Sequence, residues 1–316
     1  MATILRRFVA TRDSRSGVSI VTLGIPLSLF VLLVATTPRF FLSWENLTNL
    51  SGQMTALLIV ALGQLLVALM GGLDLSVGSV MSVATCIVSS DGSLALTIPL
   101  VIALGVAVGL VNGYGVVVFG IHPIVMTLSS MTFLQGVAYL IRTVPGGHIP
   151  ALLTLVASGR TLGVPYSLGW SVACALAVAV VLYRSRFGLH VFAVGGNPMS
   201  ARLNGVPARR VAISAYVACS LLAVIAGLFL AARTASGDPA VGTSFGLDSV
   251  TAIALGGTQL SGGVGGVVGA ITGTVSLGLV SNGMNLLNVS PFLQSAFKGV
   301  LLIVAICAQR RTAVGL

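Results

Sequence analysis

Charged side chains are scarce in this sequence. Lysine, arginine, aspartate and glutamate make up 7% of its 316 residues, whereas hydrophobic residues make up 56% and the mean hydropathy is +1.08. Soluble domains carry about 25% charged residues, because their surfaces face water. The scarcity of charge therefore excludes a soluble globular domain and indicates an integral membrane protein.

Motifs for catalysis and for metal or nucleotide binding are also missing. The four cysteines lie in apolar segments without C-x-x-C spacing, and none of the three histidines has a companion at metal-ligand spacing. The sequence has no serine nucleophile elbow, no H-E-x-x-H and no phosphate-binding G-x-x-x-x-G-K-[ST]. We therefore expect no catalytic residues, no metal site and no cofactor bound by this chain; any ATP with its Mg²⁺ would be bound by another chain.

Acidic residues number only six, and the excess of positive charge is localised. Eleven of the 16 basic residues lie in three segments: ahead of the first apolar run, between residues 184 and 210, and at the C-terminal end. This clustering is the positive-inside pattern of membrane proteins rather than a nucleic-acid-binding surface. It predicts that both termini and the 184–210 loop are cytoplasmic, which requires an even number of spans.

Long apolar runs predict an all-α, polytopic fold. A span needs about 20 apolar residues, and eight runs fit, whereas the shorter runs Val77–Ser89 and Leu247–Leu260 could either span or re-enter. The eight are Ser19–Thr36, Leu50–Met70, Leu94–Phe119, Ile124–Ile141, Tyr166–Tyr183, Val211–Ala232, Val264–Leu286 and Phe292–Ala308. We therefore predict eight to ten transmembrane helices in a single domain, residues 19–308, between cytoplasmic tails at residues 1–18 and 309–316.

Glycine is abundant, with 39 residues, and two sets of glycines recur at intervals of four. Four-residue spacing places each set on one helix face, where another backbone can approach closely. We expect these faces to be helix contacts, either static or moving. The sets are Gly105, Gly109 and Gly113, and Gly265, Gly269 and Gly273.

A short internal repeat links two further glycine-rich segments. Residues 71–78 and 256–263 both read G-G-x-x-L-S-x-G, and both join a longer apolar run to a shorter one. Transporters often contain repeated halves with interrupted helices at corresponding positions. The sequence thus suggests that these two segments are equivalent parts of such a repeat.

Asp74 is the only acid at the inner end of a predicted span. A carboxylate near hydrocarbon is costly and usually marks a partner or a path. Alternatively, Asp74 and Ser76 cap a helix that starts near Gly78, because both side chains can accept hydrogen bonds from backbone N–H groups. Capping and a role in a gate or substrate path both fit the sequence.

The 184–210 segment carries five arginines and no acid. Asn197 is a good N-cap, Pro198 suits the first helical position, and Gly205 suits a left-handed exit. These residues predict one short helix, on which Met199 and Leu203 share an apolar face. The segment either marks the cytoplasmic side beside anionic lipid or docks a cytoplasmic partner.

Three blocks of the sequence resemble the permease subunits of bacterial ABC importers for ribose and related monosaccharides. Gly71-Gly-Leu-Asp-Leu-Ser-Val-Gly78 is similar to the family's G-G-I-D-L-S-V-G. Phe192-Ala-Val-Gly-Gly-Asn-Pro-Met-Ser-Ala-Arg-Leu-Asn-Gly205 is similar to its A-I-G-G-N-P-x-A-A-R-x-x-G. Ala254-Leu-Gly-Gly-Thr-Gln-Leu-Ser-Gly-Gly-Val-Gly-Gly266 is similar to its L-G-G-T-x-x-x-G-G-x-G. Order and spacing agree over about residues 47–306, although His122-Pro-Ile-Val-Met-Thr-Leu128 departs from the family's P-P-F-I-V-T-L.

The resemblance implies an ABC-importer permease fold in a bacterial inner membrane, with three protein partners. These are a second permease chain, identical or related, a cytoplasmic ATPase, and a periplasmic sugar-binding protein. The residues that the resemblance places at the ATPase contact are Gly195, Gly196, Asn197, Pro198, Ala201, Arg202 and Gly205. The residues predicted for the gate or substrate path are Gly71, Gly72, Asp74, Ser76, Gly78, Asn112 and Thr127.

Two other functions compete with this interpretation. A self-sufficient secondary transporter or channel for a small polar solute would need no ATPase, but it leaves the short cytoplasmic helix unexplained. An intramembrane enzyme would need paired catalytic groups at membrane depth, whereas Asp74 stands alone. The predicted function is therefore transport rather than catalysis.

Overall fold

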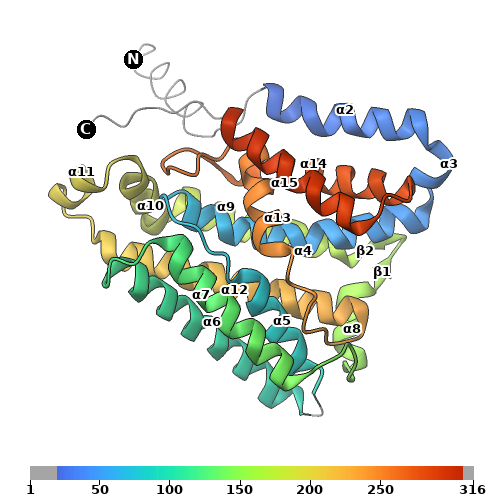
Figure 1. The fold of residues 1–316 in the computed structure, drawn as a ribbon, viewed down its shortest axis with the longest axis horizontal. Helices are drawn as coiled ribbons and strands as arrows, with labels where there is room; N and C mark the ends of the chain where they lie inside the picture. The colour runs from blue at the N-terminus through green and yellow to red at the C-terminus, as the bar shows by residue number, and fades with distance from the viewer. Residues whose placement is uncertain (1–19, 91, 309–316) are drawn as a thin grey trace.

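The computed structural model describes residues 20–90 and 92–308, so the predicted tails at residues 1–18 and 309–316 lie outside the described part. Its elements follow one another along the chain as helices, interrupted by one hairpin of two short strands (Figure 1). They are α2 (Ile20–Thr36), α3 (Pro38–Phe41), α4 (Trp44–Ala68), α5 (Val77–Val88), α6 (Leu94–Val117), α7 (Pro123–Ile141), α8 (Ala151–Ser158), β1 (Arg160–Thr161), β2 (Val164–Pro165), α9 (Tyr166–Arg184), α10 (Arg186–Gly196), α11 (Pro198–Leu203), α12 (Ala208–Thr234), α13 (Phe245–Leu255), α14 (Val267–Leu286) and α15 (Pro291–Ala308).

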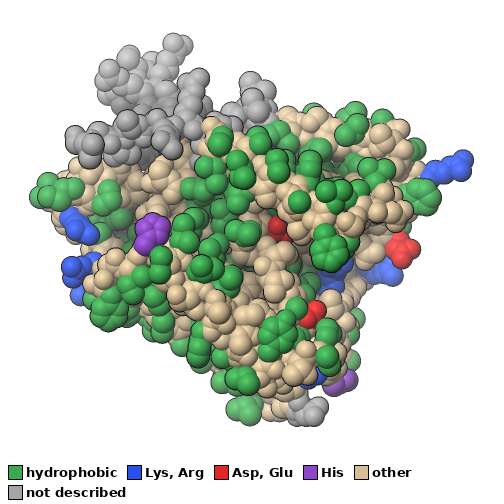
Figure 2. Space-filling model, in the orientation of Figure 1, with side chains coloured by type: hydrophobic (Ala, Val, Ile, Leu, Met, Phe, Trp, Pro, Cys, Tyr) green, Lys and Arg blue, Asp and Glu red, His purple; other side chains and the backbone are tan. Residues whose placement is uncertain are grey.

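Within the described residues, six helices are long and apolar enough to cross a membrane: α4, α6, α7, α9, α12 and α14. Shorter apolar helices cover residues 24–36, 77–88, 245–255 and 291–307. Each of these helices coincides with one of the apolar runs of the sequence, so the predicted all-α, polytopic membrane architecture is confirmed. Figure 2 shows apolar side chains spread over the visible face with few charges between them, as expected for a surface that meets lipid.

Helix α4 forms the centre of the bundle. Ser43 caps its start by accepting a hydrogen bond from the Asn46 N–H at 3.3 Å. Every residue from Thr55 to Ala68 is buried, and the helix contacts α9, α12, α13 and α14. Helices α6, α7 and α9 bury much less of their surface, so they lie at the periphery.

The first glycine set brings α6 against α12. A Cβ added at Gly109 would overlap the backbone of Val217, and one at Gly113 would lie 3.0 Å from the Ile213 Cα. Gly105 faces the Val224 side chain. The two helices can approach this closely because no side chain separates their backbones.

The second glycine set differs from the prediction at its first member. Gly269 and Gly273 lie on α14 and face the backbones of Gly256 and Ala252. Gly265 precedes α14, has a φ of +154° and faces the Thr258 side chain. It was therefore wrong to place all three on one helix face, because the helix starts only at residue 267.

Helices α5 and α13 are half-helices that begin inside the bundle. With 12 and 11 residues, they are about 18 and 17 Å long at 1.5 Å per residue, whereas the hydrocarbon core is about 30 Å thick. Their N-terminal ends converge where the backbones of Gly78 and Gly242 touch. The Ser82 hydroxyl accepts a hydrogen bond from the Gly242 N–H at 3.0 Å and fixes this approach.

The two ends of the bundle differ in what they carry (Figure 1). Helices α10 and α11 lie at one end, together with the start of α2 and the end of α15. Helix α3, the β1–β2 hairpin and α8 lie at the opposite end. The arginine-rich segment therefore shares its side of the bundle with both ends of the described chain.

Candidate functional site

The arginine-rich segment folds into two helices rather than the single one expected. Ser185 ends α9 and caps α10 by accepting a hydrogen bond from the Gly188 N–H at 3.2 Å. Val191 and Val194 on α10 are buried against the bundle. Sequence reasoning missed α10, although the cap residue and the spacing of these two valines were visible.

Helix α11 has the caps that the sequence predicts. The Asn197 side chain accepts a hydrogen bond from the Ser200 N–H at 2.9 Å, Pro198 takes the first helical position, and Gly205 has a φ of +77°. Ala201 is buried, whereas Met199 and Leu203 are 65% and 77% exposed. The helix therefore presents an apolar edge outward at the end of the bundle.

Three glycine-rich segments meet directly beneath these helices, and we name their contact the glycine junction: Leu69, Gly71, Gly195, Gly262 and Gly263. The Gly263 N–H donates a hydrogen bond to the Leu69 carbonyl at 2.8 Å. A Cβ at Gly195 would overlap that same carbonyl oxygen. One at Gly262 would lie 3.0 Å from both the Gly195 oxygen and the Gly71 nitrogen. The α10–α11 unit thus contacts both connectors, at the glycine junction through backbone atoms and at Met70 through the Val194 and Ala201 side chains.

The glycine junction corrects the interpretation of the internal repeat. Residues 71–76 lead from long α4 into short α5, whereas residues 256–266 lead from short α13 into long α14. The two segments therefore stand in opposite order relative to their long and short helices. They are contact partners at one end of the bundle, not equivalent parts of two repeated halves.

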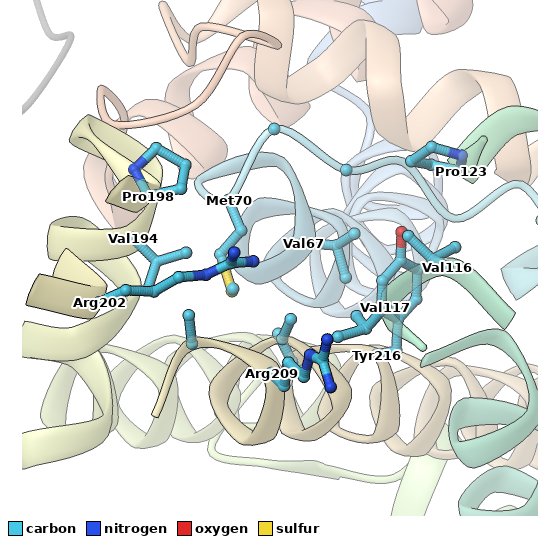
Figure 3. A pocket seen from close by; sticks show the side chains of 15 residues that line it. Val67, Met70, Val116, Val117, Pro123, Val194, Pro198, Arg202, Arg209 and Tyr216 are labelled. Carbon is cyan, nitrogen blue, oxygen red and sulfur yellow. The ribbon is translucent and has the colours of Figure 1, made fainter. Parts of the chain in front are cut away.

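A pocket of about 240 Å³ lies beside the glycine junction, and we name it the inner pocket because it is at the α10–α11 end of the bundle (Figure 3). Its walls are mostly apolar and come from α4, α6, α10, α11 and α12. Arg202 reaches into it from α11 on the side of Met70, and Arg209 stands on α12 below. Gly71 and Gly72 also line it, so this pocket joins part of the predicted gate to part of the predicted ATPase contact.

Asp74 lies at the centre of a buried polar network between α4, α5 and α6. Its Oδ1 accepts hydrogen bonds from the Ser76 N–H at 2.9 Å and from the Ser76 hydroxyl at 2.6 Å. The Asn112 amide donates to Ser76 Oγ at 2.9 Å and approaches Asp74 Oδ1 at 3.5 Å. Ser130 donates to Asn112 Oδ1 at 2.6 Å, and the Gln64 amide pairs with both backbone groups of Asp74 at 3.0 and 3.1 Å.

The structure does not support capping of α5 by Ser76. Ser76 occupies the N-cap position, yet its side chain accepts no hydrogen bond from the first turn and instead bonds to Asp74. Asp74, Ser76, Asn112 and Thr127 are all fully buried. Their role in a gate stays a prediction, because contact with a solute would require this segment to move.

Replacing Asp74 with alanine should destabilise the protein by about 1–3 kcal/mol, because it leaves the buried donors of Ser76 without an acceptor. Asp74→Asn keeps an oxygen at the Oδ1 position and should stay close to wild type. Thermal unfolding of the purified variants in detergent measures the difference. Equal stability of the two variants would contradict this account of the network.

Sequence reasoning missed a second candidate site, which we name the outer crevice because it lies toward the α3 end of the bundle, opposite α10 and α11. It is a cavity of about 220 Å³ between α4, α12, α13, α14 and α15. Lys298 on α15 donates a hydrogen bond to Asp248 Oδ2 on α13 at 2.8 Å, forming an ion pair. Gln294 bonds to Asn285 at 2.8 Å beside it. A lysine inside the last apolar run was the signal for this site.

Clusters that could hold a metal ion were sought among histidine, cysteine, aspartate and glutamate. No group of three or more of these side chains comes together in residues 20–90 and 92–308. The described part of the chain thus offers buried polar networks, an inner pocket and an outer crevice as its candidate sites. The interactions at these sites are hydrogen bonds, one ion pair and close backbone contacts.

Comparison with known proteins gives the family. A family model described as branched-chain amino acid transport system / permease component matches residues 46–306. The chain belongs to this permease family. It is 34% identical over 298 residues to the ribose import permease protein RbsC of Escherichia coli (strain K12), which covers 91% of this chain and 92% of the relative. No solved structure gives a significant match.

Further relatives have similar coverage. The ribose import permease protein RbsC of Bacillus subtilis (strain 168) is 34% identical over 300 residues, 92% of each chain. The L-arabinose transport system permease protein AraH of Escherichia coli (strain K12) is 33% identical over 291 residues, 89% of this chain and 87% of the relative. The predicted membership of an ABC-importer permease family is therefore confirmed. The family description names amino acids, whereas these relatives are named for sugars.

Proposed function

We propose that this chain is the transmembrane subunit of an ATP-driven importer for a monosaccharide in a bacterial inner membrane. The relatives named for ribose and L-arabinose import support the solute class. The observation that carries the ATP-driven part is the glycine junction beneath α10 and α11. A surface helix in backbone contact with both half-helix connectors is suited to transmit a push from a cytoplasmic ATPase.

The docking surface would be the exposed edge of α11. Met199 and Leu203 offer apolar contact area, and Arg202 adds a positive charge next to them. Closure of an ATPase dimer on two such permease chains would press α11 and α10 toward the bundle. Gly195 would pass that displacement to Leu69 and Gly263, and hence to the segments that lead into α5 and out of α13.

The permease itself would form no covalent bond and bind no nucleotide. Its contribution would be two packings of similar free energy, whose balance the ATPase and a periplasmic binding protein shift through their differential affinity. The converging starts of α5 and α13 would separate the outer crevice from the inner side in one packing. This proposal also assigns the α10–α11 end, and with it both chain ends, to the cytoplasm.

Reconstitution with and without the partners tests this function. Proteoliposomes that contain the permease, its ATPase and its binding protein should take up D-ribose or L-arabinose only when ATP is supplied. The permease alone should give no uptake along a proton or sodium gradient. Gradient-driven uptake by the chain alone would favour the secondary transporter instead.

Arg202→Glu should lower coupled uptake by about tenfold or more, because a reversed charge in a docking surface costs about 1.4 kcal/mol or more. Arg210→Glu is the matched control: it makes the same charge change on an exposed arginine of α12 that does not line the inner pocket. Uptake and ATP hydrolysis should both be measured. If both variants lose coupled uptake equally, these arginines would set the orientation of the chain in the membrane rather than dock the ATPase.

A further inference from the structure

The outer crevice has largely apolar walls that carry an ion pair and several polar side chains. Lys298 is seven residues beyond Pro291, the start of α15, which places it about 10 Å along the helix at 1.5 Å per residue. Asp248 lies in the first turn of the half-helix α13, where α13 and α5 converge. Charged groups at such depth are costly and usually line a path or a site.

The ion pair leaves hydrogen-bonding capacity open to the crevice. The side chains of Lys298 and Asp248 are 21% and 13% exposed, so neither is sealed in the core. In the described part of the chain the Lys298 ammonium makes one hydrogen bond, to Asp248 Oδ2, out of the three it can donate. Donors and a second carboxylate oxygen thus remain free beside the cavity.

Three further side chains line the crevice without a hydrogen bond among the described residues: Gln53 on α4, Ser244 before α13 and Ser281 on α14. An amide and two hydroxyls both donate and accept. Phe245 adds an aromatic face. Farther out, Arg233 is already held by the Asn49 carbonyl at 3.1 Å.

We propose that the outer crevice is a binding site for a neutral monosaccharide in the permease itself. Each sugar hydroxyl both donates and accepts, which matches the mixture of amide, hydroxyl, carboxylate and ammonium groups. A free amino acid fits less well, because Asp248 already neutralises the Lys298 ammonium and the Asn49 carbonyl already accepts a hydrogen bond from the Arg233 guanidinium. The solute class rests on the proposed function, whereas the location rests on the crevice alone.

Protection of an introduced thiol tests the site on the full chain in membranes. Cys307 is exposed and is replaced by serine, and the other three cysteines are buried. Ser244→Cys places a thiol in the crevice, whereas Ser295→Cys places one on the exposed side of α15 outside it. A charged thiol reagent added from the crevice side reports accessibility, with D-ribose, L-arabinose or L-leucine as competitor.

We expect one of the sugars to slow labelling of Ser244→Cys about threefold at twice its Kd, because about one third of the sites then stay empty. Labelling of Ser295→Cys should not change, and L-leucine should have no effect on either. Protection by L-leucine instead, or no protection at sugar concentrations that saturate uptake, would overturn the site. ATP-driven uptake by the wild-type complex tests the proposed function separately, so uptake without protection would reject the crevice alone.

Uptake kinetics give a second, independent measurement. Ser281→Ala should raise the KM for the sugar, because a hydroxyl that faces the solute is lost, whereas Ser295→Ala should leave KM unchanged. Thermal unfolding should be the same for both variants. A lowered Tm with an unchanged KM for Ser281→Ala would show that the residue is structural.

Discussion

Gly195→Ala is expected to reduce ATP-coupled uptake about tenfold or more, whereas Gly196→Ala should reduce it much less. A Cβ at position 195 would overlap the Leu69 carbonyl oxygen and lie 2.8 Å from the Gly263 nitrogen. At position 196 a Cβ meets nothing within 4 Å. Neither glycine has a positive φ, so steric overlap alone separates the two variants.

The physical reason is that the glycine junction consists of backbone atoms, which cannot change rotamer to make room. Overpacking of this kind costs about 1–3 kcal/mol and displaces the segments involved. Displacement of α10 from Leu69 and Gly263 would break the path from the docking helix to both connectors. ATP hydrolysis, uptake and Tm should be compared in both variants. Coupled uptake by Gly195→Ala at the wild-type level would show that this contact transmits nothing.

Gly78→Ala is expected to destabilise the protein by about 3 kcal/mol or more. A Cβ there would overlap the Gly242 carbonyl oxygen and lie 3.0 Å from the Gly242 carbonyl carbon and 3.4 Å from the Gly246 nitrogen. All these atoms are backbone, and they belong to the point where α5 and α13 converge. Their separation would open the centre of the bundle.

Gly136→Ala on α7 is the matched control for Gly78→Ala. Both glycines are helical, but a Cβ at position 136 meets nothing within 4 Å. Alanine there should be neutral or slightly stabilising, because alanine is the better helix former by up to about 1 kcal/mol. Folded yield in the membrane and Tm in detergent measure both variants. A stable, fully folded Gly78→Ala variant would contradict the close approach of the half-helices.

Helix α13 connects the two regions that these proposals concern. Its first turn carries Asp248 at the outer crevice. The segment that follows its last turn contains Gly263 of the glycine junction. An element of about 17 Å moves as a rigid body more readily than it bends. A displacement at the glycine junction would therefore reach the ion pair at the crevice.

Local rules were sufficient to predict the apolar helices and α11. Hydropathy located the six long and four shorter apolar helices, and Asn197, Pro198 and Gly205 fixed the bounds of α11. Four-residue glycine spacing predicted the contact face of α6. These features depend on residues close together in the chain, so the order of amino acids alone determines them.

Contacts between distant segments needed the tertiary structure. The sequence could not show that Gly195 lies on Leu69 and Gly263, because these residues are brought together only when α4, α10 and α14 pack. It also could not show that Asp248 faces Lys298, since 50 residues separate them. The sequence determined which segments enter the membrane, whereas packing decided which polar groups meet there. The physical reason is that burying a polar group costs free energy unless a hydrogen-bonding partner lies beside it.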